Sequence, residues 1–264
     1  MNLDLAQQHV LITGGSKGIG LACAEEFLKE GATVTLISRQ QANLQAAVHK
    51  LLALGYPESR IYTQAADLSQ PDEAVKALDG AEAAAGPVHI LVNSAGAAKR
   101  TPADELNPQA WAAAMQSKFF TYIYMMDPVI KRMALRGKGA IVNIIGNGGK
   151  VASPQHLAGG SANAALMLAS AGLANAYAHV GVRVNGINPG STLTDRVQQN
   201  IDVEARQKQI SQAQAQVLLT SKLPLGRMAD PQEVAQAVLF LASDRASYIT
   251  GAILQMDGAL VPMI

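Results

Sequence analysis

The sequence has very little cysteine, almost no net charge and no segment with the features of a secretion signal. Cys23 is the single cysteine among 264 residues, which excludes an internal disulfide framework. Lysine and arginine number 21 against 20 aspartates and glutamates, which excludes the basic stripe of a nucleic-acid-binding protein and an acidic tail. No basic region precedes the first apolar residues, and no apolar run reaches the expected length of a membrane span. We therefore expect a soluble, cytoplasmic protein with a small-molecule substrate and with neither nucleic-acid nor membrane partners.

The five histidines also lack the pattern of a metal site. They are scattered along the chain, and none has the short spacing to another ligand that zinc sites require. We expect no metal. Cys23 falls in a helical pattern with no accompanying histidine, so we interpret it as a buried helix residue.

What is present is a regular alternation of short apolar segments and helical patterns. The candidate strands lie at 9–15, 33–39, 60–67, 89–96, 140–146, 182–190 and 252–260. Continuously apolar strands are buried on both faces, which is typical of a parallel sheet covered by helices. Residues 1–264 are therefore predicted to form a single α/β domain, a Rossmann-type doubly wound parallel sheet flanked by helices on both faces. The glutamine-rich segment 198–221 is helical in period and is either a surface helix or, over about 194–222, a lid above a substrate pocket.

A glycine-rich loop follows the first predicted strand. It reads TGGSKGIG and carries Gly14, Gly18 and Gly20 before a predicted helix. Glycines at this place allow a tight turn and let the backbone approach a pyrophosphate at the helix N-terminus. The alternative, a turn that binds nothing, is disfavoured because the loop directly follows the first strand.

Several motifs in order along the chain resemble the short-chain dehydrogenase/reductase family. They read TGGSKGIG, AADLS, LVNSAG, VRVNGINPGSTLTD and PLGRMADPQEVAQAVLFLASDRASYITGAILQMDG. The resemblance implies a nicotinamide cofactor, with Asp67 at the adenine and Pro189, Gly190 and Thr194 beside the nicotinamide. The complete set of predicted cofactor residues is Gly14, Ser16, Lys17, Gly18, Ile19, Gly20, Ser38, Arg39, Asp67, Leu68, Asn93, Ala95, Gly96, Pro189, Gly190, Thr192 and Thr194.

The end of the second predicted strand indicates which cofactor is bound. An acidic residue there would bind the ribose 2′-hydroxyl of NAD, but this sequence has Ser38 and Arg39. With Lys17 in the glycine loop, two cations are available for a 2′-phosphate, so NADP(H) is favoured over NAD(H). The alternative is that both cations are solvated surface charges.

The same resemblance locates the family's catalytic asparagine, serine, tyrosine and lysine, and here all four positions differ. Counting from the flanking motifs gives Lys118 for the asparagine, Gly146 for the serine, Gly159 for the tyrosine and Asn163 for the lysine. An atypical member that lacks the Asn-Ser-Tyr-Lys tetrad is expected.

Three side chains remain as tentative catalytic candidates: Lys118, His156 and Asn163. His156 precedes Gly159 by three residues, and a histidine there is able to serve as an acid or base near neutral pH. The alternative is a loop histidine that touches solvent. Lys118 shares a helical face with Trp111, Ala114 and Met115, and its ammonium is expected to reach the nicotinamide ribose or the substrate oxygen. The alternative is that Lys118 extends to solvent at a subunit interface.

Two functions remain open at this stage. One is an NADP(H)-dependent oxidoreductase that moves hydride to or from a carbonyl-type substrate with a remodelled active site. The other is a non-catalytic dinucleotide-binding protein, acting as a sensor or as a partner subunit. The family resemblance also implies a homotetramer or dimer paired through the alanine- and glycine-rich segment 161–178.

Overall fold

A seven-stranded parallel sheet forms the centre of the molecule, in the order β3-β2-β1-β4-β5-β6-β7. The computed structural model describes residues 2–96 and 98–262. The strands are β1 (His9–Thr13), β2 (Thr33–Ser38), β3 (Ile61–Ala65), β4 (Ile90–Asn93), β5 (Gly139–Ile144), β6 (Val182–Pro189) and β7 (Ile253–Met256). All seven predicted strands are confirmed, and the order reverses between β1 and β4, as a doubly wound sheet requires.

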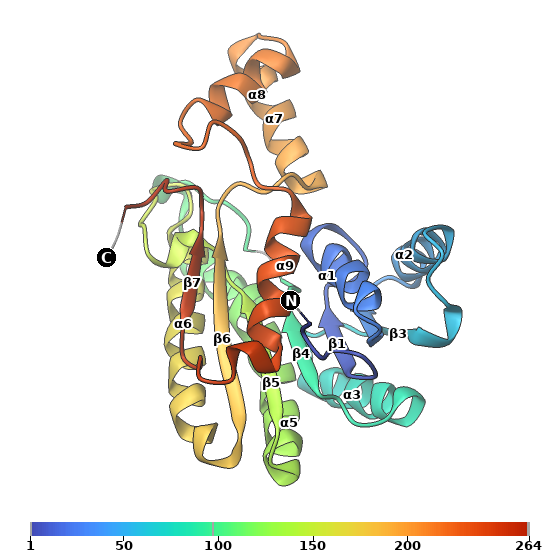
Figure 1. Cartoon of the computed structure of the whole chain (residues 1–264). Coiled ribbons are helices and arrows are strands. Elements are labelled where there is room, and N and C mark those ends of the chain that lie inside the picture. Colours follow the sequence, from blue (N-terminus) through green and yellow to red (C-terminus); the bar gives the residue numbers. More distant parts are fainter. Residues whose placement is uncertain (1, 97, 263–264) are drawn as a thin grey trace.

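Helices cover both faces of the sheet (Figure 1). One layer consists of α1 (Gly18–Lys29), α2 (Gln41–Ala53) and α9 (Pro231–Ala242). The other consists of α3 (Pro71–Ala85), α4 (Pro108–Ala114), α5 (Thr121–Arg136) and α6 (Leu157–Tyr177). Successive strand residues point to opposite layers, so Ile12 of β1 packs with the first and Leu11 with the second. Short 3₁₀ turns lie at Glu58–Arg60, Ala103–Glu105, Asn147–Gly149, Ala178–Val180 and Asp244–Ala246.

A π-helical turn, Met115–Phe120, joins α4 to α5. The expectation of one regular helical face through Trp111, Ala114 and Lys118 is therefore wrong. A π turn holds more residues than an α turn, so it shifts the faces on its two sides relative to each other. Trp111 is exposed to solvent, whereas Ala114 and Lys118 are buried.

Helix α6 lies against the sheet although its composition resembles that of a membrane span. Together with the following turn, Leu157–Val180 is long and apolar enough to cross a bilayer, so the expectation that no run reaches that length is wrong. Its buried residues, among them Leu166 and Ser170, pack on β5 and β6 in the second layer. We therefore interpret α6 as a core helix of a soluble α/β domain.

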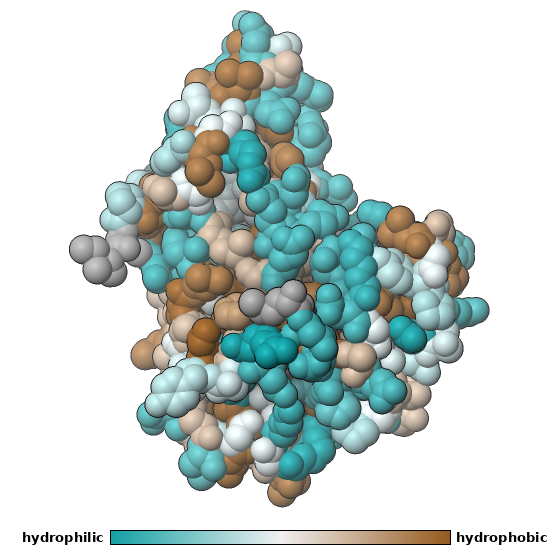
Figure 2. Space-filling view, in the orientation of Figure 1, coloured by the Kyte–Doolittle hydropathy of each residue, from teal (hydrophilic) through white to brown (hydrophobic). Residues whose placement is uncertain are grey.

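Residues 195–220 form a knob that projects beyond the carboxyl ends of the strands (Figure 1). It consists of two helices, α7 (Asp195–Lys208) and α8 (Gln212–Thr220), packed through Ile201, Ala205 and Ala215. Figure 2 shows the knob standing out from the body, with polar and apolar side chains mixed on its surface. The sequence predicted helix here but not its division in two, and the lid remains a prediction.

Candidate active site

Two adjoining cavities lie at the carboxyl ends of the strands, and both are lined by Gly96 in the loop after β4. This is the edge at which doubly wound sheets bind ligands, beside the point where the strand order reverses. The first cavity has a volume of about 630 Å³ and the second about 540 Å³. Each is therefore large enough for part of a dinucleotide or for a small substrate.

The first cavity is built around the ends of β1, β2 and β4. Seven of the predicted cofactor residues line it: Gly14, Ser38, Arg39, Asp67, Leu68, Ala95 and Gly96. Arg39 directly follows β2, where an acidic side chain would bind the ribose of NAD. The chemistry of this wall fits a phosphate on the adenosine ribose.

The glycine loop leaves room for a pyrophosphate beside this cavity. Gly14 has a positive φ of 65°, and a Cβ there would lie 2.9 Å from the Ala95 backbone. Helix α1 begins at Gly18 with no acidic residue in its first turn and no side chain capping its amide groups. Those amide groups and the helix dipole favour an anion, so the loop fits the diphosphate of NADP(H).

The remaining predicted cofactor residues occupy other places. Pro189 and Gly190 line the second cavity. Ser16, Lys17, Gly18, Ile19, Gly20, Asn93, Thr192 and Thr194 lie outside the walls of both cavities. A Cβ at Gly18 would lie 3.3 Å from the Thr194 methyl group, so the glycine loop and the segment after β6 meet.

Asn93 belongs to a buried polar chain that ties the sheet to α6. Its amide nitrogen donates to Asn143 Oδ1 at 3.0 Å, and the Asn143 amide donates to Ser170 Oγ at 2.9 Å. Thr13 Oγ1 donates to Asn93 Oδ1 at 3.2 Å. These side chains fix β1, β4 and β5 beside the site, and sequence reasoning missed Asn143 and Ser170 because their partners are distant in the chain.

The second cavity brings together every tentative catalytic candidate. Lys118, His156 and Asn163 all line it, as do Gly146 and Gly159. Lys118 comes from the π turn, Gly146 from the end of β5, and the others from the start of α6. Residues separated by up to 45 positions thus share one wall, as the family resemblance implied.

His156 occupies the space beside Gly159. It immediately precedes α6, and a Cβ at position 159 would overlap its Cε1 and lie 2.6 Å from its Nε2. A Cβ at Gly148 would lie 3.0 Å from His156 Cδ2. The imidazole is therefore packed between two glycines within the cavity wall, and the residue as a whole is half-buried.

Lys118 is buried and its ammonium group is held by two oxygen atoms. Nζ donates to Tyr122 Oη at 2.8 Å and to the carbonyl oxygen of Ile144 at 3.1 Å. It also lies 4.3 Å from the centre of the Tyr122 ring, within range of a cation–π interaction. The alternative in which Lys118 extends to solvent is therefore wrong.

Tyr122 supports Lys118 rather than reaching the cavity. Its hydroxyl donates to the Ile144 carbonyl at 2.5 Å, and its side chain is fully buried. Burial raises the pKa of Tyr122 well above its ordinary value, so the hydroxyl stays protonated. Sequence reasoning missed this residue, although its position four residues after Lys118 was a usable signal.

Asn163 faces the two glycine positions at the end of β5. A Cβ at Gly146 would lie 3.4 Å from Asn163 Nδ2, and one at Gly148 would lie 3.5 Å from it. Gly146 has a φ of 123°, and its amide nitrogen donates to Asn188 Oδ1 at 3.3 Å. The Asn163 amide thus provides a hydrogen-bond donor beside the two glycines Gly146 and Gly148.

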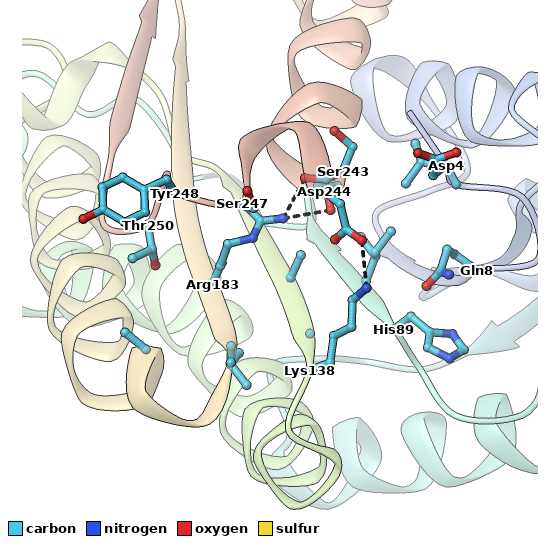
Figure 3. A pocket seen from close by; sticks show the side chains of 18 residues that line it. Asp4, Gln8, His89, Lys138, Arg183, Ser243, Asp244, Ser247, Tyr248 and Thr250 are labelled. Atoms are coloured by element: carbon cyan, nitrogen blue, oxygen red, sulfur yellow. Dashed lines mark hydrogen bonds and ion pairs between the residues drawn. The ribbon is translucent and has the colours of Figure 1, made fainter. Parts of the chain in front are cut away.

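A third cavity lies at the amino ends of β4, β5 and β6, and its charged side chains are paired (Figure 3). Arg183 dominates it, but its guanidinium donates to the carbonyl oxygens of Leu241, Ala242 and Ser243 at 2.7–3.0 Å. It thereby satisfies the carboxyl end of α9. Lys138 pairs with Asp244 at 2.8 Å. These charged groups already have partners, so this cavity is structural.

Comparison with known proteins gives matches along almost the entire chain. A family model described as enoyl-(acyl carrier protein) reductase matches residues 14–260. D-threitol dehydrogenase of Mycolicibacterium smegmatis is 34% identical over 248 residues, which cover 94% of this chain and 90% of that protein.

Two solved structures share the whole architecture. L-sorbose reductase from Gluconobacter frateurii, complexed with NADPH and L-sorbose, has a TM-score of 0.93 at 28% identity and covers 100% of both chains. An NADPH-bound short chain oxidoreductase from Pseudomonas aeruginosa PAO1, described as containing an atypical catalytic center, has a TM-score of 0.89 at 30% identity. That likeness covers 98% of this chain and 100% of the other.

Proposed function

The chain belongs to the short-chain dehydrogenase/reductase family, and from that premise we propose that it moves hydride between NADP(H) and a carbonyl-type substrate at an active site of unusual composition. It is an NADP(H)-binding oxidoreductase of this family. The main support for the proposed site is that Lys118, His156 and Asn163 line one cavity. In that cavity the family's serine and tyrosine positions are Gly146 and Gly159.

The two adjoining cavities support a place for the cofactor. Arg39 and the glycine loop would hold the adenosine phosphate and the diphosphate, and Pro189 and Gly190 would border the nicotinamide. When bound, NADP(H) supplies or accepts the hydride. The protein's own groups then have to orient the substrate and handle the charge that develops on its oxygen.

Lys118 is the fixed positive charge of this site. Tyr122 Oη and the Ile144 carbonyl hold its ammonium group, so it needs little reorganisation when negative charge develops on the substrate oxygen. Tyr122 is a positioning residue in this scheme. Its hydroxyl and the Ile144 carbonyl already bond to each other, which keeps the support in place.

His156 is the proton donor, and Asn163 is the orienting donor. The imidazole occupies the space beside Gly159, where the family's tyrosine side chain would begin. An imidazole titrates near neutral pH and exchanges a proton with the substrate oxygen through a ring nitrogen. The Asn163 amide lies beside Gly146, where it would donate a hydrogen bond to the substrate and fix its approach.

The test is turnover by single variants with a panel of ketones, imines and quinones. Lys118→Met keeps the side-chain length and removes the charge, and we expect a loss of roughly 100-fold or more in kcat/KM. His156→Gln removes the titrating group, with an expected loss of about 10²–10⁴-fold. Lys76→Met, on the exposed face of α3, is the matched control and should retain full activity.

Two results would contradict this proposal. Unchanged kcat/KM in both site variants would remove Lys118 and His156 from the mechanism. NADPH binding by the natural protein without turnover of any panel member would instead favour a non-catalytic, dinucleotide-bound sensor or partner subunit.

The same proposal includes a cytoplasmic homotetramer, with a dimer as the smaller alternative. Helix α6 supports it, because its outward face consists of small residues around the exposed Leu168. Small side chains let helices of two subunits approach closely. The 194–222 segment, which forms the knob, is proposed as the substrate lid because it borders the second cavity through Val197.

A further inference from the structure

The second cavity carries positive charge only. Lys99, Arg100 and Lys118 line it together with His156, and none of its described lining residues is acidic. The wall of the first cavity, by contrast, contains Asp67 as well as Arg39. The third cavity also contains aspartates beside its cations. A wall of one sign raises the local concentration of ligands of the opposite sign.

Lys99 and Arg100 at the rim have no acidic partner among the described residues. Both are exposed and follow β4, and no carboxylate of the described chain lies within 4.0 Å of either. Arg227, at another place on the surface, by contrast forms a two-bond pair with Glu233 at 2.7 Å. Two adjacent cations without a counter-charge repel each other, and an anion between them relieves that repulsion.

The charges in this cavity lie at two depths. Lys118 is buried, and its ammonium group is held at the floor by Tyr122 and Ile144. Lys99 and Arg100 are exposed at the mouth. A volume of about 540 Å³ accommodates a molecule that reaches both. The floor cation suits the reacting oxygen, which leaves the rim cations for a second, permanently charged group.

We propose that the substrate is a carbonyl compound that also carries an anionic group, a carboxylate or a phosphate ester, bound by Lys99 and Arg100. This inference rests on the proposed function, because it assigns the reacting carbonyl to the cavity that holds Lys118 and His156. Arginine binds both kinds of anion through two parallel N–H···O bonds, and lysine adds a point charge. The anionic group therefore selects the substrate, and the floor residues act on its other end.

Calorimetric titration of the NADP⁺-saturated protein tests the proposal with matched probes. The carboxylate arm compares 4-oxopentanoate with the neutral 4-oxopentanamide, and the phosphate arm compares dihydroxyacetone phosphate with dihydroxyacetone. We expect the anion to bind about 10-fold more tightly than its neutral partner in at least one arm. The arm that shows the preference identifies the source of the charge.

Variants assign that preference to the rim. In the double variant Lys99→Gln/Arg100→Gln the anion should bind no better than its neutral partner. Lys150→Gln changes an exposed lysine near the cavity that is absent from its wall, and should retain the preference. The NADPH affinity and Tm of each variant are measured alongside, to show that the fold and the cofactor site are intact.

Equal binding within both arms, or binding of no anion, would overturn the inference. A preference that survives the double variant would also overturn it, because the charge would then be bound elsewhere. Failure of the proposed function is distinct, since it would appear as absence of NADPH binding or of turnover, whatever the charge of the probe.

Discussion

Arg39 directly follows β2 and lines the first cavity, where a 2′-phosphate on the adenosine ribose would need a positive charge. Arg39→Ala should weaken NADPH binding about 10-fold and leave NADH binding nearly unchanged, because only NADPH carries that phosphate. Titration calorimetry with both cofactors measures the difference. Lys76→Ala, at an exposed position of α3, is the control. Equal losses for the two cofactors would show that Arg39 contacts a shared part of them.

The burial of His9, which lies outside the candidate active site, should make the stability of the fold depend on pH. The Nδ1 of His9 lies 2.7 Å from the Gly86 carbonyl oxygen and its Nε2 lies 2.8 Å from Thr35 Oγ1. Burial lowers the pKa of His9, and burial, with Arg136 nearby, lowers the pKa of His89. The unfolded chain therefore binds more protons than the folded chain once the pH falls below about 6.5.

The free energy of unfolding should consequently be highest above about pH 6.5, where both histidines are neutral, and should fall as the pH drops from there toward 5. Urea unfolding at about pH 7.5 and about pH 5 measures this difference. His9→Gln should reduce it, although the variant is less stable at both pH values. His49→Gln, which replaces an exposed imidazole on α2, should leave it as it is. An unaltered difference in His9→Gln would contradict the assignment.

For the candidate active site, the positions of the side chains could be predicted from the sequence better than the groups that hold them in place. Counting from flanking motifs gave Lys118 and Asn163, and His156 was named as the residue three before Gly159; all three line one cavity. The motifs gave no information on what holds the Lys118 ammonium group. One partner is a backbone carbonyl of β5, and backbone atoms leave no residue-type signal in a sequence.

Helix α8 begins with a capping box that controls the stability of the knob. Ser211 Oγ accepts a hydrogen bond from the Gln214 amide at 3.2 Å, and Gln214 Oε1 accepts one from the Ser211 amide at 2.9 Å. Ser211→Ala should cost about 1 kcal/mol locally. Hydrogen exchange should accelerate about fivefold in α7 and α8 and remain unchanged in α9, because the knob has its own small cluster of buried residues. Equal acceleration in α9 would mean that the knob and the body unfold together.

The break between α7 and α8 and the π turn before α5 are two places where helical periodicity in the sequence does not predict the end of a helix. No glycine or proline separates α7 from α8, and α7 ends at Gln209 in a left-handed conformation with a φ of 52°. The π turn before α5 likewise contains ordinary helix-forming residues. Both breaks depend on packing and capping rather than on residue type, so a sequence pattern extends straight through them.

At the scale of the whole molecule, the exposed face of α6 predicts assembly. Leu168 is 77% exposed in the single chain, on a helix otherwise rich in small residues. Leu168→Asp should shift the protein from a tetramer to smaller species, because it places a charge at the proposed subunit contact. Light scattering at micromolar concentration measures the mass. Leu54→Asp, at the end of α2 in the other layer, should leave the mass unchanged. A monomeric natural protein would refute the assembly.

The architecture itself was predictable because its main signal is local and repeated. Each strand is short, apolar and followed by a helical pattern, and a parallel arrangement is the solution that buries such strands on both faces. The sheet order and the placement of the glycine loop follow from that pattern. The knob's position above the sheet does not, because it depends on contacts between segments with no shared periodicity.

The packing of His156 against Gly159 makes the space open to each of these residues depend on the other. Any side chain larger than hydrogen at position 159 displaces the imidazole, so a tyrosine cannot be gained there while His156 keeps its place. Removing the imidazole first leaves position 159 as a glycine, and the intermediate then has neither group. Gaining the larger side chain first would instead require the imidazole to swing out of the wall, so in either order a substitution at one position changes what the other can do.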